Sequence, residues 1–319
     1  MKKLALLLAA LSVASVSYAK EVMPEAAPVV EEAPVVEQEV VEVKAAPVLR
    51  VTSVGQTLKV VDTSSQGTKN DANIGEAVHL ENRVGLALGD DWTFNLMARK
   101  TWEASTDDAH TGKEVWDGMR SAGHRIDLQA TRNFENFSLG LRWRGEKNQD
   151  AIFLPVSYKF GMVSGWFDPA YYFVNGDNAN AEDYFYLEAE PVQLSYGPVT
   201  LAYYFEGFKY AGDGCVVEDK KSDYAHQARL RGTLFQNDDF KVGAEYRYQF
   251  AQDVEMLNGK DGLENNKHTA ILSLAYNVTE NLVVDTYYQY NFNKYEANDA
   301  SAKDDDYKGE FGLGWTYNF

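Results

Sequence analysis

The chain has 319 residues, and its 30 Lys and Arg against 48 Asp and Glu give a formal net charge of -18. This acidity argues against a nucleic-acid-binding protein, because phosphates need a basic surface, and a single cysteine excludes a disulfide framework or a multi-cysteine metal site. Mean hydropathy is -0.41 and no apolar run of about 18 residues follows the first twenty, so we expect no membrane-spanning helix.

The first nineteen residues have the pattern of a secretory signal peptide. Lys2 and Lys3 form a short basic start, residues 4–16 are apolar, and Ser17 and Ala19 place small side chains before a cleavage site. The apolar run is too short to cross a bilayer, although a buried N-terminal helix is an alternative interpretation. We therefore predict that residues 1–19 are removed and that the mature chain, from Lys20, lies outside the cytoplasm of a bacterium.

Residues 20–47 form a segment of Glu, Val, Ala and Pro with repeated Ala-Pro-Val-Val steps. Prolines at 24, 28, 34 and 47 interrupt any continuous helix or central strand, and seven glutamates repel one another. Such a composition buries too little apolar surface to offset its ordering entropy. We predict a flexible periplasmic linker, with binding to the cell wall or to a partner as the alternative.

From residue 48 to the C-terminus, apolar and polar residues alternate with a period of two. A strand places successive side chains on opposite faces, so this pattern predicts strands with one apolar and one polar face. Residues 240–250 show it most clearly. One face carries Phe240, Val242, Ala244, Tyr246, Tyr248 and Phe250, and the other carries Lys241, Gly243, Glu245, Arg247 and Gln249.

The predicted strands are longer than usual, and their connections alternate between short and long. Most have 10–14 residues, enough for a tilted strand to cross a membrane. Only the connection near 147–150 is short where a long one is expected, and strand one is the least regular, with a bulge expected at Val54-Gly55. We predict fourteen strands at 48–61, 74–88, 92–103, 119–132, 137–147, 151–160, 164–174, 183–195, 199–210, 223–235, 240–252, 267–278, 282–295 and 307–319.

These features predict an all-β fold in residues 48–319, namely a transmembrane antiparallel up-and-down β-barrel. Short turns on one side and long loops on the other are the asymmetry of bacterial outer-membrane barrels. An open sheet edge in hydrocarbon would leave backbone groups unpaired, so the sheet must close on itself. We therefore expect the bacterial cell outer membrane as the location.

The two ends of the chain carry a resemblance to known families. The last strand alternates Phe311, Leu313, Trp315, Tyr317 and Phe319, and ends on an aromatic residue. It resembles the C-terminal strand that the barrel-assembly machinery recognises in outer-membrane proteins, which implies that role for Trp315, Tyr317 and Phe319. The opening MKKLALLL…AKEVMPE and the Glu/Pro/Val arm look like the major outer-membrane porins of fusobacteria. The whole chain is similar to the monomeric fourteen-stranded porins typified by outer-membrane protein G.

If the apolar face meets lipid, the polar face lines the lumen. Unpaired buried charge is very costly, so a charged interior without an apolar core must hold water. The basic residues expected there are Arg83, Arg99, Arg125, Arg142, Arg144, Arg229, Arg231, Lys241, Arg247 and Lys308. The acidic residues expected there are Glu81, Glu103, Asp127, Glu146, Glu188, Glu190, Glu206, Glu245, Asp285 and Glu310.

The arginines of this lumen have two interpretations. Arg142 with Arg144 and Arg229 with Arg231 form inward guanidinium pairs, which suit anionic solutes such as acidic sugars. Alternatively, neighbouring acids neutralise each arginine and the pairs only stiffen the wall. The predicted outer loops are acidic and would steer cations towards the mouth, so the sequence does not assign an ion preference.

The sequence predicts an outer-membrane porin for passive diffusion of small hydrophilic solutes and ions. The alternatives are a channel for acidic oligosaccharides that uses the four paired arginines, or a surface adhesin or receptor anchored by the barrel. Expected partners are outer-membrane lipid, lipopolysaccharide, the barrel-assembly machinery and small solutes, and not nucleic acid. We expect no enzyme, cofactor or metal, because His79, His110, His124, His226 and His268 lack metal-ligand spacing and no catalytic constellation stands out.

Overall fold

The structure is a computed structural model that describes residues 48–64, 72–106, 116–174, 182–212, 220–296, 303 and 305–319. The chain divides into residues 1–46 and residues 47–319. The predicted signal peptide (1–19) and linker (20–47) lie outside the described residues, which all belong to the second unit. Among the described residues, no helix is long and apolar enough to cross a membrane.

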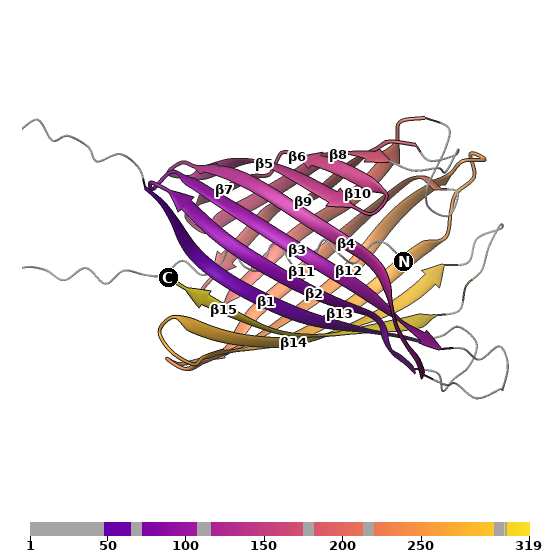
Figure 1. Ribbon diagram of the computed structural model, residues 1–319. Coiled ribbons are helices and arrows are strands. Elements are labelled where there is room, and N and C mark those ends of the chain that lie inside the picture. The colour runs from indigo at the N-terminus through magenta and orange to yellow at the C-terminus, as the bar shows by residue number, and fades with distance from the viewer. Residues whose placement is uncertain are drawn as a thin grey trace, which may run out of the picture. The chain divides into compact units, whose positions relative to one another are not determined.

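The second unit is built from long, tilted antiparallel strands (Figure 1). The strands are β1 (Leu49–Ser64), β2 (Ala72–Leu88), β3 (Trp92–Thr106), β4 (Trp116–Asn133), β5 (Phe137–Glu146), β6 (Gln149–Phe153), β7 (Val156–Phe160), β8 (Val163–Val174), β9 (Tyr184–Tyr196), β10 (Val199–Tyr210), β11 (Lys220–Gln236), β12 (Phe240–Met256), β13 (Glu264–Asn277), β14 (Leu282–Glu296) and β15 (Asp306–Asn318).

Every strand except β6 and β7 pairs with its neighbours in the chain, and the first strand pairs with the last. The β1–β15 ladder runs from Ser53↔Asn318 to Thr63↔Lys308 and closes the sheet into a barrel. β6 and β7 share one place between β5 and β8, so the wall has fourteen strand positions. The predicted fold class and strand number are confirmed.

Two prolines explain why one wall strand divides into β6 and β7. Pro155 has no N–H to donate, so the ladder pattern stops at Leu154 and Pro155. The carbonyl of Pro155 still accepts the N–H of Gly140 at 2.7 Å, and Leu154 donates to the carbonyl of Pro169 at 3.0 Å. The wall therefore continues across this break, as the single predicted strand at 151–160 implies.

The bulges of β1 differ from the expectation. The β1–β2 register shifts between Val51 and Ser53 and again between Val61 and Asp62, not at Val54-Gly55. A Cβ on Gly55 would lie 2.8 Å from the carbonyl oxygen of Trp315 on the neighbouring strand. Gly55 thus serves a close backbone approach at the closing seam rather than a bulge.

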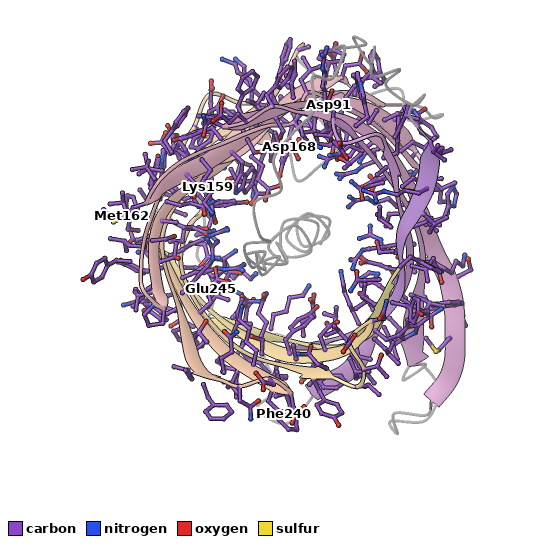
Figure 2. The ribbon with its side chains drawn as sticks, turned by 90° about the vertical axis from the view of Figure 1, so that its left-hand side faces the viewer. Asp91, Lys159, Met162, Asp168, Phe240 and Glu245 are labelled. Atoms are coloured by element: carbon purple, nitrogen blue, oxygen red, sulfur yellow. The ribbon has the colours of Figure 1, made fainter. Side chains whose placement is uncertain are left out.

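The barrel has its polar face inside and its apolar face outside, the reverse of a soluble protein. Arg144 and Glu190 are each 1% exposed on the inward face, whereas Leu272 on the outward face is 57% exposed. Viewed along its axis, the barrel shows Asp168 and Glu245 on the inner side of the wall, and Met162 and Phe240 on the outer side (Figure 2). This inversion is the arrangement that lipid outside and polar groups inside require.

The inward Gly312 makes room for a tyrosine ring on the neighbouring strand. Gly312 pairs with Tyr287, and a Cβ on Gly312 would lie 2.0 Å from that ring. The ring is held in place by a 2.5 Å hydrogen bond that its hydroxyl donates to Glu310. We expect Gly312→Ala to destabilise the barrel by about 1–3 kcal/mol, because overpacking forces the ring to move.

Gly232→Ala is the matched control for this prediction. A Cβ there would meet only the carbonyl oxygen of Pro198, at 4.0 Å, so we expect little change in stability. Urea unfolding of both refolded variants in vesicles measures the difference. Equal stability of Gly312→Ala and the wild type would show that the ring does not need this space.

Candidate functional site: the inward face of the barrel

The residues expected in the lumen lie on the inward face of the wall, among them Arg83, Arg99, Arg125, Arg142, Arg144, Glu188, Glu190, Glu206, Arg229, Arg231, Glu245 and Arg247. They come from β2, β3, β4, β5, β9, β10, β11 and β12, and cross-strand pairs such as Arg99↔Arg125, Asp127↔Arg144 and Glu188↔Glu206 place them side by side. The structure groups most of them into three ionic clusters. The pore-lining role itself stays a prediction.

The first cluster is centred on Glu81 of β2, which is 2% exposed. It accepts a 2.7 Å hydrogen bond from Lys59 Nζ of β1, contacts Arg83, and lies 4.0 Å from Arg99 of β3. Arg99 also approaches Glu146 of β5 at 3.8 Å. One buried carboxylate thus stands between three cationic groups, and Glu146 provides a second carboxylate for Arg99.

The second cluster joins β4, β5 and β8. Asp127 lies between Arg125, on its own strand, and Arg144 Nε at 3.0 Å on β5. Arg144 also donates a 2.9 Å hydrogen bond to the hydroxyl of Tyr172, and Arg142 pairs with Asp168 of β8. The guanidinium carbons of Arg142 and Arg144 lie 4.0 and 4.4 Å from the centre of the Phe153 ring.

The third cluster joins β9, β11 and β12 around Glu190. This carboxylate accepts a 2.7 Å hydrogen bond from Arg229 Nη1 and also pairs with Arg231. Arg231 continues to Glu245 at 3.1 Å, and Glu245 accepts a 2.7 Å hydrogen bond from Arg247 Nε. Charges alternate along this chain, so each buried guanidinium has a carboxylate within contact distance.

Between the second and third clusters, three carboxylates stand in direct register. Asp168 of β8 pairs with Glu188 of β9, which pairs with Glu206 of β10. The hydroxyl of Tyr204 lies 2.8 Å from Glu188 and 3.0 Å from Glu206, and Tyr186 contacts the same two carboxylates. Like charges opposite each other are unfavourable, and these hydroxyl donors and Arg142 offset the repulsion.

The four arginines of the acidic-sugar hypothesis are therefore occupied by the protein's own groups. Arg142, Arg144 and Arg229 are 6%, 1% and 3% exposed, and each pairs with a carboxylate. Of the four, only Arg231 keeps a substantially exposed side chain, at 27%. This geometry corresponds to the interpretation in which neighbouring acids neutralise the arginines and stiffen the wall.

Several inward residues were missed at the sequence level. Lys59 and Asp168 complete the first two clusters, and Phe153, Tyr172 and Tyr204 provide rings and hydroxyls beside the arginines. The alternation of strand 164–174 would have identified Asp168. Lys59 was hidden by the mixed pattern of strand one, which is interrupted by two bulges.

Two exposed lysines stand apart from the clusters, at the end of the barrel with the short turns. Lys159 of β7 pairs with Ser164, and Lys241 of β12 precedes Gly243 and Glu245 on the inward face. Within the described part of the chain, neither has a carboxylate within ion-pair distance. Both side chains are exposed to solvent.

The predicted assembly residues lie on the outward face of the closing strand. Trp315, Tyr317 and Phe319 are 39%, 38% and 70% exposed. Trp315 pairs with Gln56 of β1, and the N–H of Phe319 donates to the carbonyl of Thr52 at 3.0 Å. Recognition of these residues by an assembly machinery stays a prediction.

No metal-binding arrangement of three or more His, Cys, Asp or Glu side chains occurs among the residues that the structure describes. His226 and His268 lie on the outward face, where each ring is 2.7 Å from a tyrosine hydroxyl, Tyr203 and Tyr246 respectively.

No protein-family model matches this sequence, and no curated protein matches it. Among solved structures, the chain is similar to an anion-selective porin from Comamonas acidovorans, with 14% identity and a TM-score of 0.44 over 85% of this chain and 100% of that chain. It is also similar to Salmonella typhi OmpF in a complex with daunomycin, with 12% identity and a TM-score of 0.48 over 84% of this chain and 97% of that chain. It is similar as well to the outer membrane protein opdK from Pseudomonas aeruginosa, with 8% identity and a TM-score of 0.43 over 84% of this chain and 99% of that chain. Similarity at this level says nothing about ligand or activity.

Proposed function

We propose that the protein is an outer-membrane porin through which small hydrophilic solutes and ions diffuse passively. The observation that carries this proposal is the inverted barrel, with acidic and basic side chains inside and exposed apolar side chains outside. An exposed apolar band around a closed barrel needs lipid, and an interior of charged groups needs water.

The size of the wall supports diffusion rather than a solid interior. Fourteen strands spaced about 4.8 Å apart and tilted by about 40° give a backbone cylinder roughly 28 Å across. Inward side chains take up about 5 Å on each side, as judged from strand and sheet spacings. The remaining width accommodates hydrated ions and small sugars.

The barrel's location and assembly belong to the same proposal. Both described ends of the barrel, Leu49 and Asn318, lie with the short turns, which in outer-membrane barrels face the periplasm. The long connections then face outward, where contact with surface partners would occur. The outward aromatic residues of β15 would be read by the barrel-assembly machinery, and lipopolysaccharide would surround the outer half.

Reversing the charges of the two exposed lysines tests the channel directly. We expect Lys159→Glu with Lys241→Glu to leave a stable conductance but to raise the cation-to-anion permeability ratio by about twofold or more, because mouth charges concentrate ions of opposite sign. Reversal potentials across planar bilayers in a salt gradient measure this ratio.

Lys209→Glu is the control, because Lys209 is exposed on the outward face of β10, beside Phe185 in the register. It should leave the permeability ratio unchanged. A wild-type protein that folds but carries no current would overturn the porin proposal. An unchanged ratio in the double variant would instead remove the two lysines from the ion path.

A further inference from the structure

One outer connection differs from all the others. The turn between β5 and β6 has two residues, Lys147 and Asn148, whereas the other connections at this end have seven to nine. The barrel wall therefore extends least far along the barrel axis at this turn, and the turn lies close to the lipid boundary. The sequence showed the same exception without a reason for it.

Beside this turn, two basic side chains face outward in direct register. Lys100 of β3 pairs with His124 of β4, and Lys100 pairs on its other side with Leu80. The outward direction follows from Ile126, 42% exposed and two residues from His124, and from Leu58, 38% exposed, which pairs with Leu80.

The third basic residue is Lys147 itself. The β4–β5 ladder ends at Arg125↔Glu146, so the next residues along the two chains are His124 and Lys147. Lys147 and His124 are both exposed. Lys100 on β3, His124 on β4 and Lys147 in the β5–β6 turn therefore follow one another around the barrel, and we call these three residues the outer basic row.

The outer basic row lies at the height of a membrane interface. Lys100 is eight residues along β3 from Trp92 at the other end, which corresponds to about 20 Å along the barrel axis, near the edge of an apolar band of about 25 Å. Two outward tryptophans lie on the same strands as the row or next to it. Trp102 is two residues beyond Lys100 on β3, and Trp143 on β5 is 37% exposed. Tryptophan is typical of this boundary.

Among the described residues, no carboxylate forms an ion pair with the row. No ion pair joins Lys100, His124 or Lys147 to a carboxylate within the described ranges, whereas the inward arginines are paired. The nearest outward acid in the register is Asp150, opposite Gly145. A phosphate at this place would be attracted by the ammonium groups of Lys100 and Lys147.

We propose that Lys100, His124 and Lys147, with the hydroxyl of Ser121, bind a phosphate group of lipid A in the outer leaflet. Ser121 Oγ already contacts the Lys100 ammonium group, so hydroxyl and ammonium donors meet at one point. Ammonium, imidazole and hydroxyl donors match the acceptor oxygens of a phosphate. The proposal rests on the outer-membrane location and orientation given under the proposed function.

Lipid A binding to refolded protein in phospholipid nanodiscs tests this site. We expect Lys100→Gln with Lys147→Gln to weaken binding of diphosphorylated lipid A by about 30-fold. Each basic residue at a membrane surface raises the affinity for anionic lipid by about fivefold, and the two effects multiply. Lys100→Arg with Lys147→Arg should retain binding, which separates lost charge from lost folding. The control is Lys209→Gln with Lys294→Gln, two exposed outward lysines on β10 and β14, and it should change binding less than threefold.

Dephosphorylated lipid A and inorganic phosphate distinguish the sources of the anion. The proposal requires that wild-type protein binds dephosphorylated lipid A as weakly as the Gln variant binds diphosphorylated lipid A. It also requires that millimolar phosphate does not displace diphosphorylated lipid A from the wild-type protein. Equal binding of the two lipids, full binding by the Gln variant, or displacement by free phosphate would each overturn it. Conductance of the Gln variant in phospholipid bilayers should equal that of the wild type, so failure of the lipid site leaves the porin proposal standing.

Discussion

Replacing Glu190 by Gln is expected to destabilise the barrel by about 3–5 kcal/mol, because it leaves buried charge without a partner. Glu190 is 1% exposed and pairs with both Arg229 and Arg231. Arg229 is itself 3% exposed and stacks with its guanidinium carbon 3.3 Å from the centre of the Tyr204 ring, so it cannot turn towards water without losing that contact. Urea unfolding of refolded protein in lipid vesicles, followed by tryptophan fluorescence, measures the loss.

Glu146→Gln is the matched control for this substitution. The side chain of Glu146 is 22% exposed and lies 3.8 Å from Arg99, so its removal should cost less than about 1 kcal/mol. Adding Arg229→Gln to Glu190→Gln should recover part of the stability, because the buried charge then disappears with its partner. Similar losses in the Glu190 and Glu146 variants would mean that water reaches the third cluster freely.

Leu272→Arg is expected to destabilise the inserted barrel by about 2–4 kcal/mol, the cost of a charged side chain on the lipid face near the middle of the membrane. Leu272 is 57% exposed on the outward face of β13, four residues from Tyr276 towards one end and four from His268 towards the other. Vesicle unfolding and the yield of membrane insertion both report this cost.

The adjacent residue provides the control on the same strand. Ile271 pairs with Glu245 and Gln289 on the inward face, so Ile271→Arg places a guanidinium beside a carboxylate and an amide. We expect this variant to insert normally and to lose less than about 1 kcal/mol. If Ile271→Arg lost more stability than Leu272→Arg, lipid would lie against the polar face, and this result would contradict the inverted barrel.

The strands and their facing directions were predictable because both depend on local pattern. Every predicted strand boundary lies within three residues of the boundary in the structure, except the end of the strand predicted at 240–252, which continues to Met256. The hairpin of β12 and β13 runs further than expected, to Met256 and from Glu264, because polar residues there continue the strands beyond the apolar band on which the prediction depended.

The ionic partners were not predictable, because they depend on register and bulges. Arg231 and Glu190 are 41 residues apart, and they meet across β10. Two residues of β9, Glu190 and Pro191, stand opposite one residue of β10, Tyr204. Proline cannot donate to the ladder, and the resulting bulge shifts the register beside Glu190.

The sequence by itself therefore determined that the chain forms a closed barrel with a polar inward face, since a period of two places successive side chains on opposite faces and only the apolar face suits lipid. Only the tertiary structure decided that Arg142, Arg144 and Arg229 form internal ion pairs with buried carboxylates, while Lys159 and Lys241 stay exposed. The difference arises because a side chain's face is set by its own strand, whereas its electrostatic partner is set by how neighbouring strands slide past one another.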